Sequence, residues 1–421
     1  MLADRCDAAL ASGAAGQNWF RRLFDQPAYV VAPMVDQSEH TFRVLCRRHG
    51  ATLAYTPMFS SRQWVESEQY RRTIFGPTEG SVEADDRPLV VQFAGNDPEV
   101  LLAAAKHVQH RCNAVDVNFG CPQKIAKRGR YGAWLLHEPE LMEQLVGTLH
   151  CHLECPVTAK IRVCQQDGFK SKRASLSETI DRARSLVGAG ASVIALHGRT
   201  REQKGSEQGA ADWEAIAALA QAVSVPVLAN GGVSSLDEAR ACLASTGADG
   251  VMAAEGLLSN PALFDSAAGP SGSAQEALAL EYLDLQGTHP PAELRAVKQH
   301  LFSMCYAGLQ VHTDLRERMH LARSLTQMRE VVSELEGRPR ASRPPFSTEV
   351  GPRHTGWYGR HTWELERAAL KKAERCGEAR AEAEAAPAAA QIAAAQPQDG
   401  VDAMAASGRA TPPEAGREES S

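Results

Sequence analysis

The sequence predicts a (β/α)8 TIM barrel followed by a small all-helical domain and a disordered C-terminal tail. Between residues 29 and 268, short β-branched runs of strand length alternate with helical stretches, and eight such units can be counted. This alternation is the signature of a parallel sheet built from βα units. The span also fits the size of such a barrel, which usually takes about 250 residues. A doubly wound open sheet stays the alternative, because the number of strands does not prove closure.

The expected strands and helices follow one another in regular order. The strand candidates are Tyr29–Ala32, Leu53–Thr56, Leu89–Phe93, Ala114–Val117, Val157–Arg162, Val193–His197, Val227–Asn230 and Gly250–Ala253. The expected helices between them include Ser38–His49, Pro98–His110, Glu138–His150, Ser177–Ala189, Trp213–Val223 and Leu236–Ser245. After the last strand, Asn260–Phe264 is expected to start a further helix, and residues 269–273 to form a hinge.

Four further segments flank the barrel. Residues 1–28 are expected to form a flexible leader and a cap, and residues 341–385 a linker and a charged helix. Residues 386–421 contain no aromatic residue and are rich in Ala, Gln and Pro, so we expect disorder. Residues 269–340 predict a helical domain, because apolar side chains recur there at helical spacing. These are Leu301, Met304, Leu309, Leu315, Met319, Leu321, Leu325, Met328, Val331, Val332 and Leu335.

Composition limits the possible partners. The 421 residues include 45 Lys and Arg against 51 Asp and Glu, a net charge of -6, so any RNA-binding surface must be local. The 10 cysteines form no Cys-x-x-Cys pair, and a disulfide framework is not indicated. Residues 150–155 hold two His and two Cys, but no second pair follows at zinc-site spacing, so we expect a helix end and no metal. With no signal peptide and no membrane-length apolar run, we expect a protein of the cytoplasm and/or the nucleus without membrane contact. We also expect a monomer.

The loop after the fourth expected strand carries a cysteine. Gly120 and Pro122 end the strand and open a turn on which Cys121 sits. Because Lys124 and further cations follow closely, the surroundings are electropositive, as reactive thiols require. The alternative is that Cys121 is a small buried hydrophobic residue.

Polar residues at the other strand ends indicate a flavin site, because barrel chemistry lies where the strands end. A flavin needs an apolar floor, hydrogen bonds and a cation at its pyrimidine edge, and backbone amides around its phosphate. Pro33 and Met34, with Val35, could supply the floor, and Gln92 and Lys160 the hydrogen bonds and the cation. Gly231 and Gly232, with the segment from Ala254 through Glu255 to Gly256, permit close approach of a phosphate. Singly, each of these residues is also compatible with ordinary packing.

The motifs at these strand ends resemble those of the tRNA-dihydrouridine synthases, FMN enzymes that reduce a uracil ring in tRNA. Within the family, the eukaryotic branch named for D-loop positions 16 and 17 is resembled by Arg128-Gly129-Arg130-Tyr131-Gly132-Ala133 and by Ala254-Glu255-Gly256 followed by Asn260-Pro261-Ala262-Leu263-Phe264. The resemblance to the family as a whole covers about residues 28–338. It rests on Ala32-Pro33-Met34, Val91-Gln92-Phe93-Ala94-Gly95, Asp116-Val117-Asn118-Phe119-Gly120-Cys121-Pro122, Lys160-Ile161-Arg162, His197-Gly198-Arg199-Thr200 and Asn230-Gly231-Gly232. Many members carry Gly-Arg-Gly where this chain has Ala254-Glu255-Gly256, which leaves the backbone amides to bind the phosphate.

The resemblance implies roles for these residues. NADPH, or NADH, would reduce FMN, the flavin would pass hydride to C6 of the uracil, and Cys121 would protonate C5 as a general acid. The expected cofactor-binding residues are Pro33, Met34, Val35, Gln92, Lys160, His197, Asn230, Gly231, Gly232, Ala254 and Glu255. The expected substrate-binding residues are Asn118, Arg162, Lys124, Arg128, Arg130 and Arg199. The resemblance also implies that the helical domain at residues 269–340 binds tRNA. Two other functions stay open: an FMN barrel that reduces a free pyrimidine or an enone, and a non-catalytic RNA-binding scaffold.

Overall fold

The computed structural model describes residues 19–75, 86–166, 173–204, 209–267, 275–288 and 292–338. Eight parallel strands within these ranges form a closed barrel, in the order β2-β1-β11-β10-β9-β6-β5-β4, and pairing of β2 with β4 completes the ring. The predicted barrel is therefore confirmed, and the open sheet is excluded. The strands are β1 (Ala28–Val31), β2 (Leu53–Tyr55), β4 (Leu89–Ala94), β5 (Ala114–Phe119), β6 (Val157–Arg162), β9 (Ala191–His197), β10 (Val227–Asn230) and β11 (Gly250–Ala253).

The observed strands follow the apolar runs of the sequence, but β5 continues two residues further than expected. Asn118 and Phe119 belong to it, and both are buried. Asn118 stays in the strand because its polar side chain finds partners inside the barrel rather than in solvent. Inward-pointing polar side chains near the strand ends are therefore part of the barrel wall.

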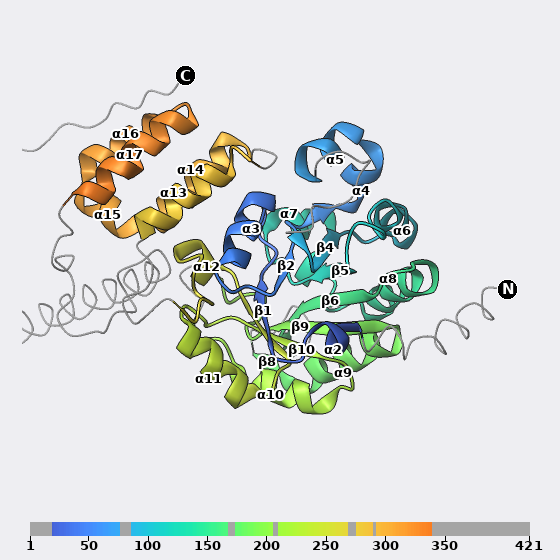
Figure 1. Cartoon of the computed structure of the whole chain (residues 1–421). Coiled ribbons are helices and arrows are strands. Elements are labelled where there is room, and N and C mark those ends of the chain that lie inside the picture. Colours follow the sequence, from blue (N-terminus) through green and yellow to red (C-terminus); the bar gives the residue numbers. More distant parts are fainter. Residues whose placement is uncertain are drawn as a thin grey trace, which may run out of the picture. The chain divides into compact units, whose positions relative to one another are not determined.

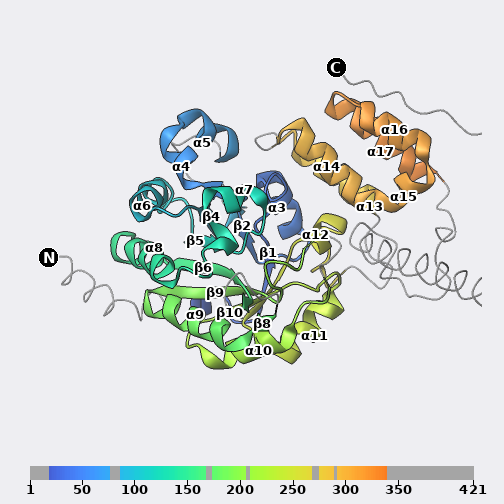
Figure 2. The same ribbon diagram turned by 180° about the vertical axis from the view of Figure 1, so that it is seen from behind.

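Helices cover the outside of the strands (Figure 1 and Figure 2). Four of them begin at a side chain that accepts a hydrogen bond from the first turn, which stabilises a helix by about 1 kcal/mol. These N-caps are Asp97, Ser175, Asp212 and Ser235. The covering helices are α3 (His40–Arg48), α6 (Pro98–Lys106), α8 (Pro139–His152), α9 (Leu176–Gly188), α10 (Trp213–Ala222) and α11 (Leu236–Thr246). Helix α8 ends in the His/Cys cluster, as the sequence indicated.

One expected helix is wrong. The helix after β11 is α12 (Glu255–Ser259), and it ends where Asn260–Phe264 was expected to begin one. Pro261 cannot donate a backbone hydrogen bond, and the Asn260 side chain accepts from the amide of Ala262 at 3.1 Å. This local turn replaces the helix.

Smaller elements fill the gaps around the barrel, and apart from α2, which lies in the cap expected within residues 1–28, the sequence did not predict them. A strand and two helices form an insertion after β2, held by the stacked rings of Phe59 and Trp64. Helix α2 contributes Trp19 to the interior of the barrel, where its indole donates to Ser192 at 2.9 Å. The small elements are α2 (Trp19–Leu23), β3 (Phe59–Ser60), α4 (Ser61–Glu66), α5 (Glu68–Phe75), α7 (Lys124–Gly129), η2 (Gly132–Trp134), β7 (Cys164–Gln165) and β8 (Ala174–Ser175).

The segment after the barrel is helical, as the apolar spacing predicted. It comprises α13 (Gln275–Leu285), α14 (Leu294–Met304), α15 (Tyr306–Val311), α16 (Thr313–Leu321) and α17 (Leu325–Gly337). Most of the predicted apolar stripe is buried, but Leu321 is 57% exposed. Leu321 ends α16, and the next residue, Ala322, takes the buried position. The hinge at 269–273, the leader up to residue 18, the linker and the tail lie outside the described residues.

A buried polar cluster joins this helical segment to the barrel. Glu39, which precedes α3, accepts a hydrogen bond from the Tyr282 hydroxyl at 2.6 Å and contacts His300 Nε2 at 3.0 Å. The His300 ring is fully buried and stacks on Phe42 at 4.3 Å between centroids. Burial opposes ionisation of Glu39, but the charge and hydrogen bond of His300 hold its pKa below the usual value.

Within the described ranges, no helix has both the length and the apolarity to cross a membrane.

Candidate active site

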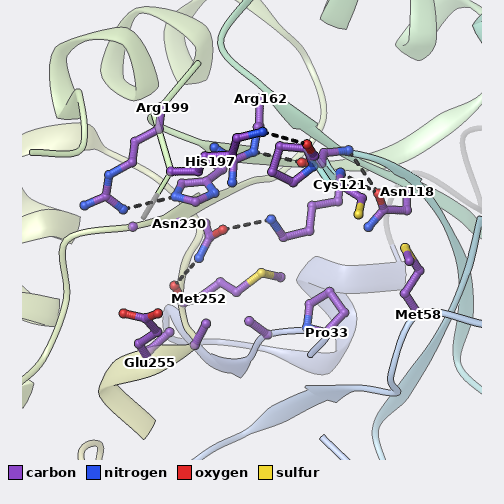
Figure 3. Close-up of a pocket in the computed structure, with 18 of the residues that line it drawn as sticks. Pro33, Met58, Asn118, Cys121, Arg162, His197, Arg199, Asn230, Met252 and Glu255 are labelled. Atoms are coloured by element: carbon purple, nitrogen blue, oxygen red, sulfur yellow. Dashed lines mark hydrogen bonds between the residues drawn. The ribbon is translucent and has the colours of Figure 1, made fainter. Parts of the chain in front are cut away.

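A cavity of about 430 Å³ opens at the carboxyl ends of the barrel strands, within the range of small-molecule and cofactor sites. Most predicted site residues line it, although they come from seven different strands or the loops that follow them (Figure 3). They are Pro33, Val35, Gln92, Asn118, Cys121, Lys160, Arg162, His197, Arg199, Asn230, Gly231, Gly232, Ala254 and Glu255. The barrel thus assembles the set that the sequence singled out.

Four predicted residues lie outside this lining. Met34 packs against the hydrophobic core instead of forming the cavity floor. Lys124, Arg128 and Arg130 lie on α7 and at its end, exposed to solvent beside the Cys121 loop. Sequence reasoning also missed lining residues, among them Met58, Gln203, Val233 and Met252. Met58 closely follows β2, so its position after a strand end was an available signal.

Strand register brings the polar residues to the same level. Asn118 of β5 pairs with Lys160 of β6, and two residues further along β6 Arg162 pairs with His197 of β9. His197 in turn pairs with Asn230 of β10. Because side chains two residues apart on a strand point to the same face, these groups converge on one cavity.

Several hydrogen bonds fix the loop that carries Cys121. The Asn118 side chain accepts from the backbone amides of Gly120 at 3.1 Å and Cys121 at 2.9 Å. From the other side, Arg162 Nε donates to the Gly120 carbonyl at 2.8 Å, and Lys204 donates to the Pro122 carbonyl at 3.1 Å. The thiol is therefore held at one position in the cavity wall.

Burial raises the pKa of the Cys121 thiol, although a hydrogen bond from the Gln123 backbone and the charges of Arg162, Lys160 and Lys204 work in the opposite direction. The thiol is thus protonated at neutral pH. Nearby cations alone would favour a thiolate, but burial outweighs their charge here. A protonated, positioned thiol suits proton donation better than nucleophilic attack.

Two buried basic side chains, Lys160 and Arg162, point into the same cavity. Lys160 is 7% exposed and donates to the Asn230 amide oxygen at 2.8 Å. Arg162 donates to backbone carbonyls, including that of Thr200 at 2.9 Å. Burial, with the charge of Arg162, lowers the pKa of Lys160 to about 7, and burial lowers the pKa of Arg162 to about 10. In the described part of the chain, neither cation forms a salt bridge, so the cavity favours an anionic ligand.

His197 completes the basic group. Burial, with the charges of Arg162 and Lys160, holds its pKa well below the usual value, so the ring is neutral. Its Nε2 lies 3.1 Å from Nη1 of Arg199, which fits an imidazole nitrogen that accepts from the guanidinium.

Glycines after β10 leave room for a ligand at the backbone. Gly231 has φ +108°, and a Cβ there would meet His197 Cδ2 at 3.0 Å. Gly232 also has a positive φ, +78°. Both positions therefore require glycine, and their exposed backbone suits close approach of a phosphate.

Among the described residues, no three His, Cys, Asp or Glu side chains are arranged to hold a metal ion.

The fold and the site together define a (β/α)8-barrel protein with a basic, cysteine-bearing cavity at the carboxyl ends of its strands. Residues 30–338 match the Dihydrouridine synthase (Dus) family over most of the chain. The chain therefore belongs to the dihydrouridine synthase family.

The chain is also similar in sequence to individual members of this family. The chain is 44% identical over 310 residues to the tRNA-dihydrouridine(16/17) synthase [NAD(P)(+)]-like protein of Rattus norvegicus, covering 74% of this chain and 67% of that protein. It is 40% identical over 313 residues to the tRNA-dihydrouridine(16/17) synthase [NAD(P)(+)] of Schizosaccharomyces pombe, covering 72% of this chain and 75% of that protein. A tRNA-dihydrouridine(20a/20b) synthase [NAD(P)+]-like protein of Mus musculus is 40% identical over 238 residues, 56% of this chain and 68% of that protein.

Proposed function

We propose that this protein is an FMN-dependent tRNA-dihydrouridine synthase that reduces the C5-C6 double bond of uridines at positions 16 and 17 of the D-loop. The observation that carries the proposal is the Cys121 loop, fixed by hydrogen bonds in a basic cavity at the strand ends. Similarity to the 16/17 relatives extends over 310 residues, against 238 for the 20a/20b relative, and supports the choice of positions.

The residues that line the cavity suit FMN. The buried Lys160 donates to the neutral Asn230 amide and forms no salt bridge within the described residues, and Gly231 and Gly232 leave the backbone open for a phosphate. The residues that would hold the cofactor are Pro33, Val35, Gln92, Lys160, His197, Asn230, Gly231, Gly232 and the backbone around Ala254 and Glu255. When bound, FMN supplies the hydride for C6 of the uracil after reduction by NADPH or NADH.

Cys121 supplies the proton for C5. Its thiol is half-buried, and burial raises its pKa, so the proton is retained until the ring carbon becomes basic. Arg162 forms no salt bridge within the described residues, and its side chain lines the cavity beside Cys121. We propose that Arg162 and Asn118 contact the uracil ring, and that Arg199 contributes to the same end of the cavity.

A uracil stacked within a folded tRNA cannot reach this cavity, so the base must be extruded, at a cost of about a few kcal/mol. Contacts with the RNA backbone would compensate for that cost. Lys124 and Arg128 on α7 are exposed beside the Cys121 loop and have no partner within the described residues. Arg130 is different, because it contacts Glu138 at 3.0 Å.

The helical segment offers a second set of cations, of which only some are free to contact RNA. Arg318 pairs with Glu334, and Arg329 contacts Asp284 at 2.5 Å. The side chains of Arg295 and Arg323 are exposed and form no such pair within the described ranges. We propose that these two arginines contact the tRNA backbone.

The decisive experiment follows flavin reoxidation. The protein is reduced under anaerobic conditions and mixed with tRNA that lacks dihydrouridine, and the oxidised-flavin absorbance is recorded. We expect fast reoxidation by tRNA and not by free uridine. Cys121→Ala should keep its flavin and its tRNA affinity but reoxidise at least ~100-fold more slowly, the usual contribution of a general acid. Cys151→Ala, on α8 away from the cavity, is the matched control.

Each outcome decides one part of the proposal. A Cys121→Ala variant with nearly normal rates would remove Cys121 from the acid role. Reoxidation of the wild-type protein by a free pyrimidine or an enone, but not by tRNA, would replace the substrate. Purification without bound flavin, and no flavin binding when FMN is added, would remove the cofactor and leave RNA binding without catalysis.

A further inference from the structure

A continuous chain of hydrogen bonds runs beneath the Cys121 loop. Thr158 Oγ1 donates to Oδ1 of Asp116 at 2.6 Å, and Gln92 Nε2 donates to Oδ2 of Asp116 at 2.8 Å. Asn118 Nδ2 then donates to Oε1 of Gln92 at 2.8 Å. Oδ1 of Asn118 accepts from the backbone amides of Gly120 and Cys121 at 3.1 and 2.9 Å. Every bond in the chain is buried except the last, which is partly buried.

The two ends of this chain determine the direction of every bond in it. A backbone amide can only donate, and an ionised carboxylate can only accept. The amides of Gly120 and Cys121 therefore require the oxygen of Asn118, which turns its NH2 group toward Gln92. Gln92 must then present its oxygen to Asn118 and its own NH2 group to Asp116. Asp116 satisfies that last donor, so no buried polar group in the chain is left without a partner.

We propose that Asp116 is a positioning residue that acts through the Gln92 and Asn118 amides and thereby holds the loop carrying Cys121. The consequence for proton transfer rests on the proposed synthase function, whereas the control of the loop does not. The carboxylate is completely buried at the level of Gln92, its register partner on β4. Among the described residues, the Asp116 side chain forms hydrogen bonds only with Gln92 and Thr158. Its carboxylate therefore takes part in this chain alone.

Charge and burial at Asp116 agree with this role. Burial raises the pKa of Asp116 to about 6, while hydrogen bonds from Thr158 and Gln92 and the charge of Lys160 favour the ionised form. The ionisable groups around it are Lys160 and Tyr55, and burial together with the Asp116 charge raises the pKa of the Tyr55 hydroxyl. Near neutral pH the carboxylate is thus available as an acceptor.

The fixed direction also determines what the cavity wall offers to a ligand. Because the oxygens of Gln92 and Asn118 are occupied within the chain, each NH2 group keeps one hydrogen that the chain does not use. Both residues line the cavity. The wall at β4 and β5 therefore presents N–H donors, which match the carbonyl oxygens of a flavin or uracil ring and not ring N–H groups.

Exchange of the acidic and amide side chains between positions 116 and 118 tests the inference. In the Asn118→Asp variant, the new carboxylate can still accept from the loop amides, but it can no longer donate to Gln92. Gln92 then lies between two carboxylates with only one NH2 group, so its oxygen must face one of them, acceptor against acceptor. The double variant Asp116→Asn/Asn118→Asp removes this conflict, because the chain can run in the opposite direction. Its new carboxylate at position 118 would accept from the NH2 group of Gln92, and the Gln92 oxygen would accept from the new amide at position 116. The oxygen of that amide would accept from Thr158, and composition and net charge are unchanged.

The readout is the alkylation rate of Cys121 by iodoacetamide in the flavin-loaded protein, measured by mass spectrometry of the peptide that contains it. We expect Asn118→Asp to raise this rate about tenfold, as the loss of one buried hydrogen bond would. The double variant should return within about twofold of the wild type, a coupling typical of residues in one network. Asp116→Asn alone should have a small effect, because an amide can keep the original direction. Asp97→Asn, at the α6 N-cap, is the matched control.

Three results would overturn the inference. One is a double variant alkylated as fast as Asn118→Asp. Another is an unchanged alkylation rate in a folded Asp116→Leu variant, with folding checked by its thermal melting. The third is an Asp97→Asn effect of the same size. A wild-type protein that does not reduce uridine would reject the proposed function while leaving the alkylation result valid, so the two failures can be told apart.

Discussion

Gly132 lies directly against Cys121. A Cβ atom built on Gly132 would be 2.8 Å from the Cys121 carbonyl oxygen and 2.9 Å from its Cβ, closer than real Cβ contacts. Gly132 also has φ +66°, which L side chains rarely adopt. The amide of Ala133 donates to the same carbonyl at 3.1 Å, so this turn supports the cysteine from behind.

Gly132→Ala should therefore displace Cys121 while the flavin residues on the other strands stay in place. We expect uridine reduction to slow by about 10- to 100-fold, because a shift of about 1 Å at a reacting group can have that effect. Flavin content should be close to that of the wild type. Single-turnover reoxidation of the reduced protein by tRNA measures the rate.

Gly188→Ala is the matched control for this substitution. Gly188 ends α9, and nothing lies within 4 Å of a Cβ built there. Its rate should equal that of the wild type. An equally active Gly132→Ala variant would show that the loop tolerates displacement and that the position of Cys121 is less critical than its contacts indicate.

FMN binding should depend on pH above neutrality. Burial lowers the pKa of Lys160 to about 7 in the ligand-free cavity, and an anionic ligand in contact would raise it again. Binding then takes up a proton above pH 7, so FMN affinity should fall by up to about tenfold per pH unit between about pH 7 and 9. Quenching of flavin fluorescence in the apoprotein measures the dissociation constant.

Lys160→Met should bind FMN more weakly at pH 7 and should lose this pH dependence. Lys106→Met, at the exposed end of α6, is the control and should retain it. A wild-type affinity that is constant from pH 7 to 9 would mean that Lys160 does not contact the bound flavin.

Two arginines at the end of α7 should differ in their effect on tRNA binding. Arg130 contacts Glu138 at 3.0 Å, whereas Arg128 has no acidic partner within the described residues. Arg128→Ala should weaken tRNA binding uniformly and reduce the slope of log affinity against log salt by about 1, as expected for one lost phosphate contact. Arg130→Ala should change the slope less. Equal slopes for both variants would place the RNA elsewhere.

Sequence patterns predicted the barrel and most of the cavity because both follow local rules. The apolar runs predicted the bounds of β6, β10 and β11 to the residue. Because the site of a barrel lies at the carboxyl ends of its strands, predicting a strand end also predicts residues of the site. The chain through Asp116 could also have been suspected, since Asp116 and Asn118 are two residues apart and must share a face. The pairing of Arg130 with Glu138 could not, because it depends on a left-handed turn at Arg130, φ +50°.

The cluster of Glu39, Tyr282 and His300 should stabilise the attachment of the helical segment to the barrel. Glu39→Gln would remove the charge while keeping the size of the side chain. Removal of one charge from a buried ion pair typically lowers the free energy of unfolding by about 3 kcal/mol. Thermal or urea unfolding of the flavin-loaded protein measures the difference, and Glu68→Gln, on exposed α5, is the control.

The sign of the pH dependence distinguishes this cluster from ordinary packing. The pKa of Glu39 is below its usual value of 4.5 in the folded protein, so its stabilising contribution is complete above pH 4.5 and is lost as pH falls through the folded-state pKa. The stability difference between wild type and Glu39→Gln should therefore be largest near pH 6 and shrink in acid. A difference that stays constant between pH 6 and pH 3 would mean that the side chain acts through packing and hydrogen bonding alone, without the ionic interaction with His300.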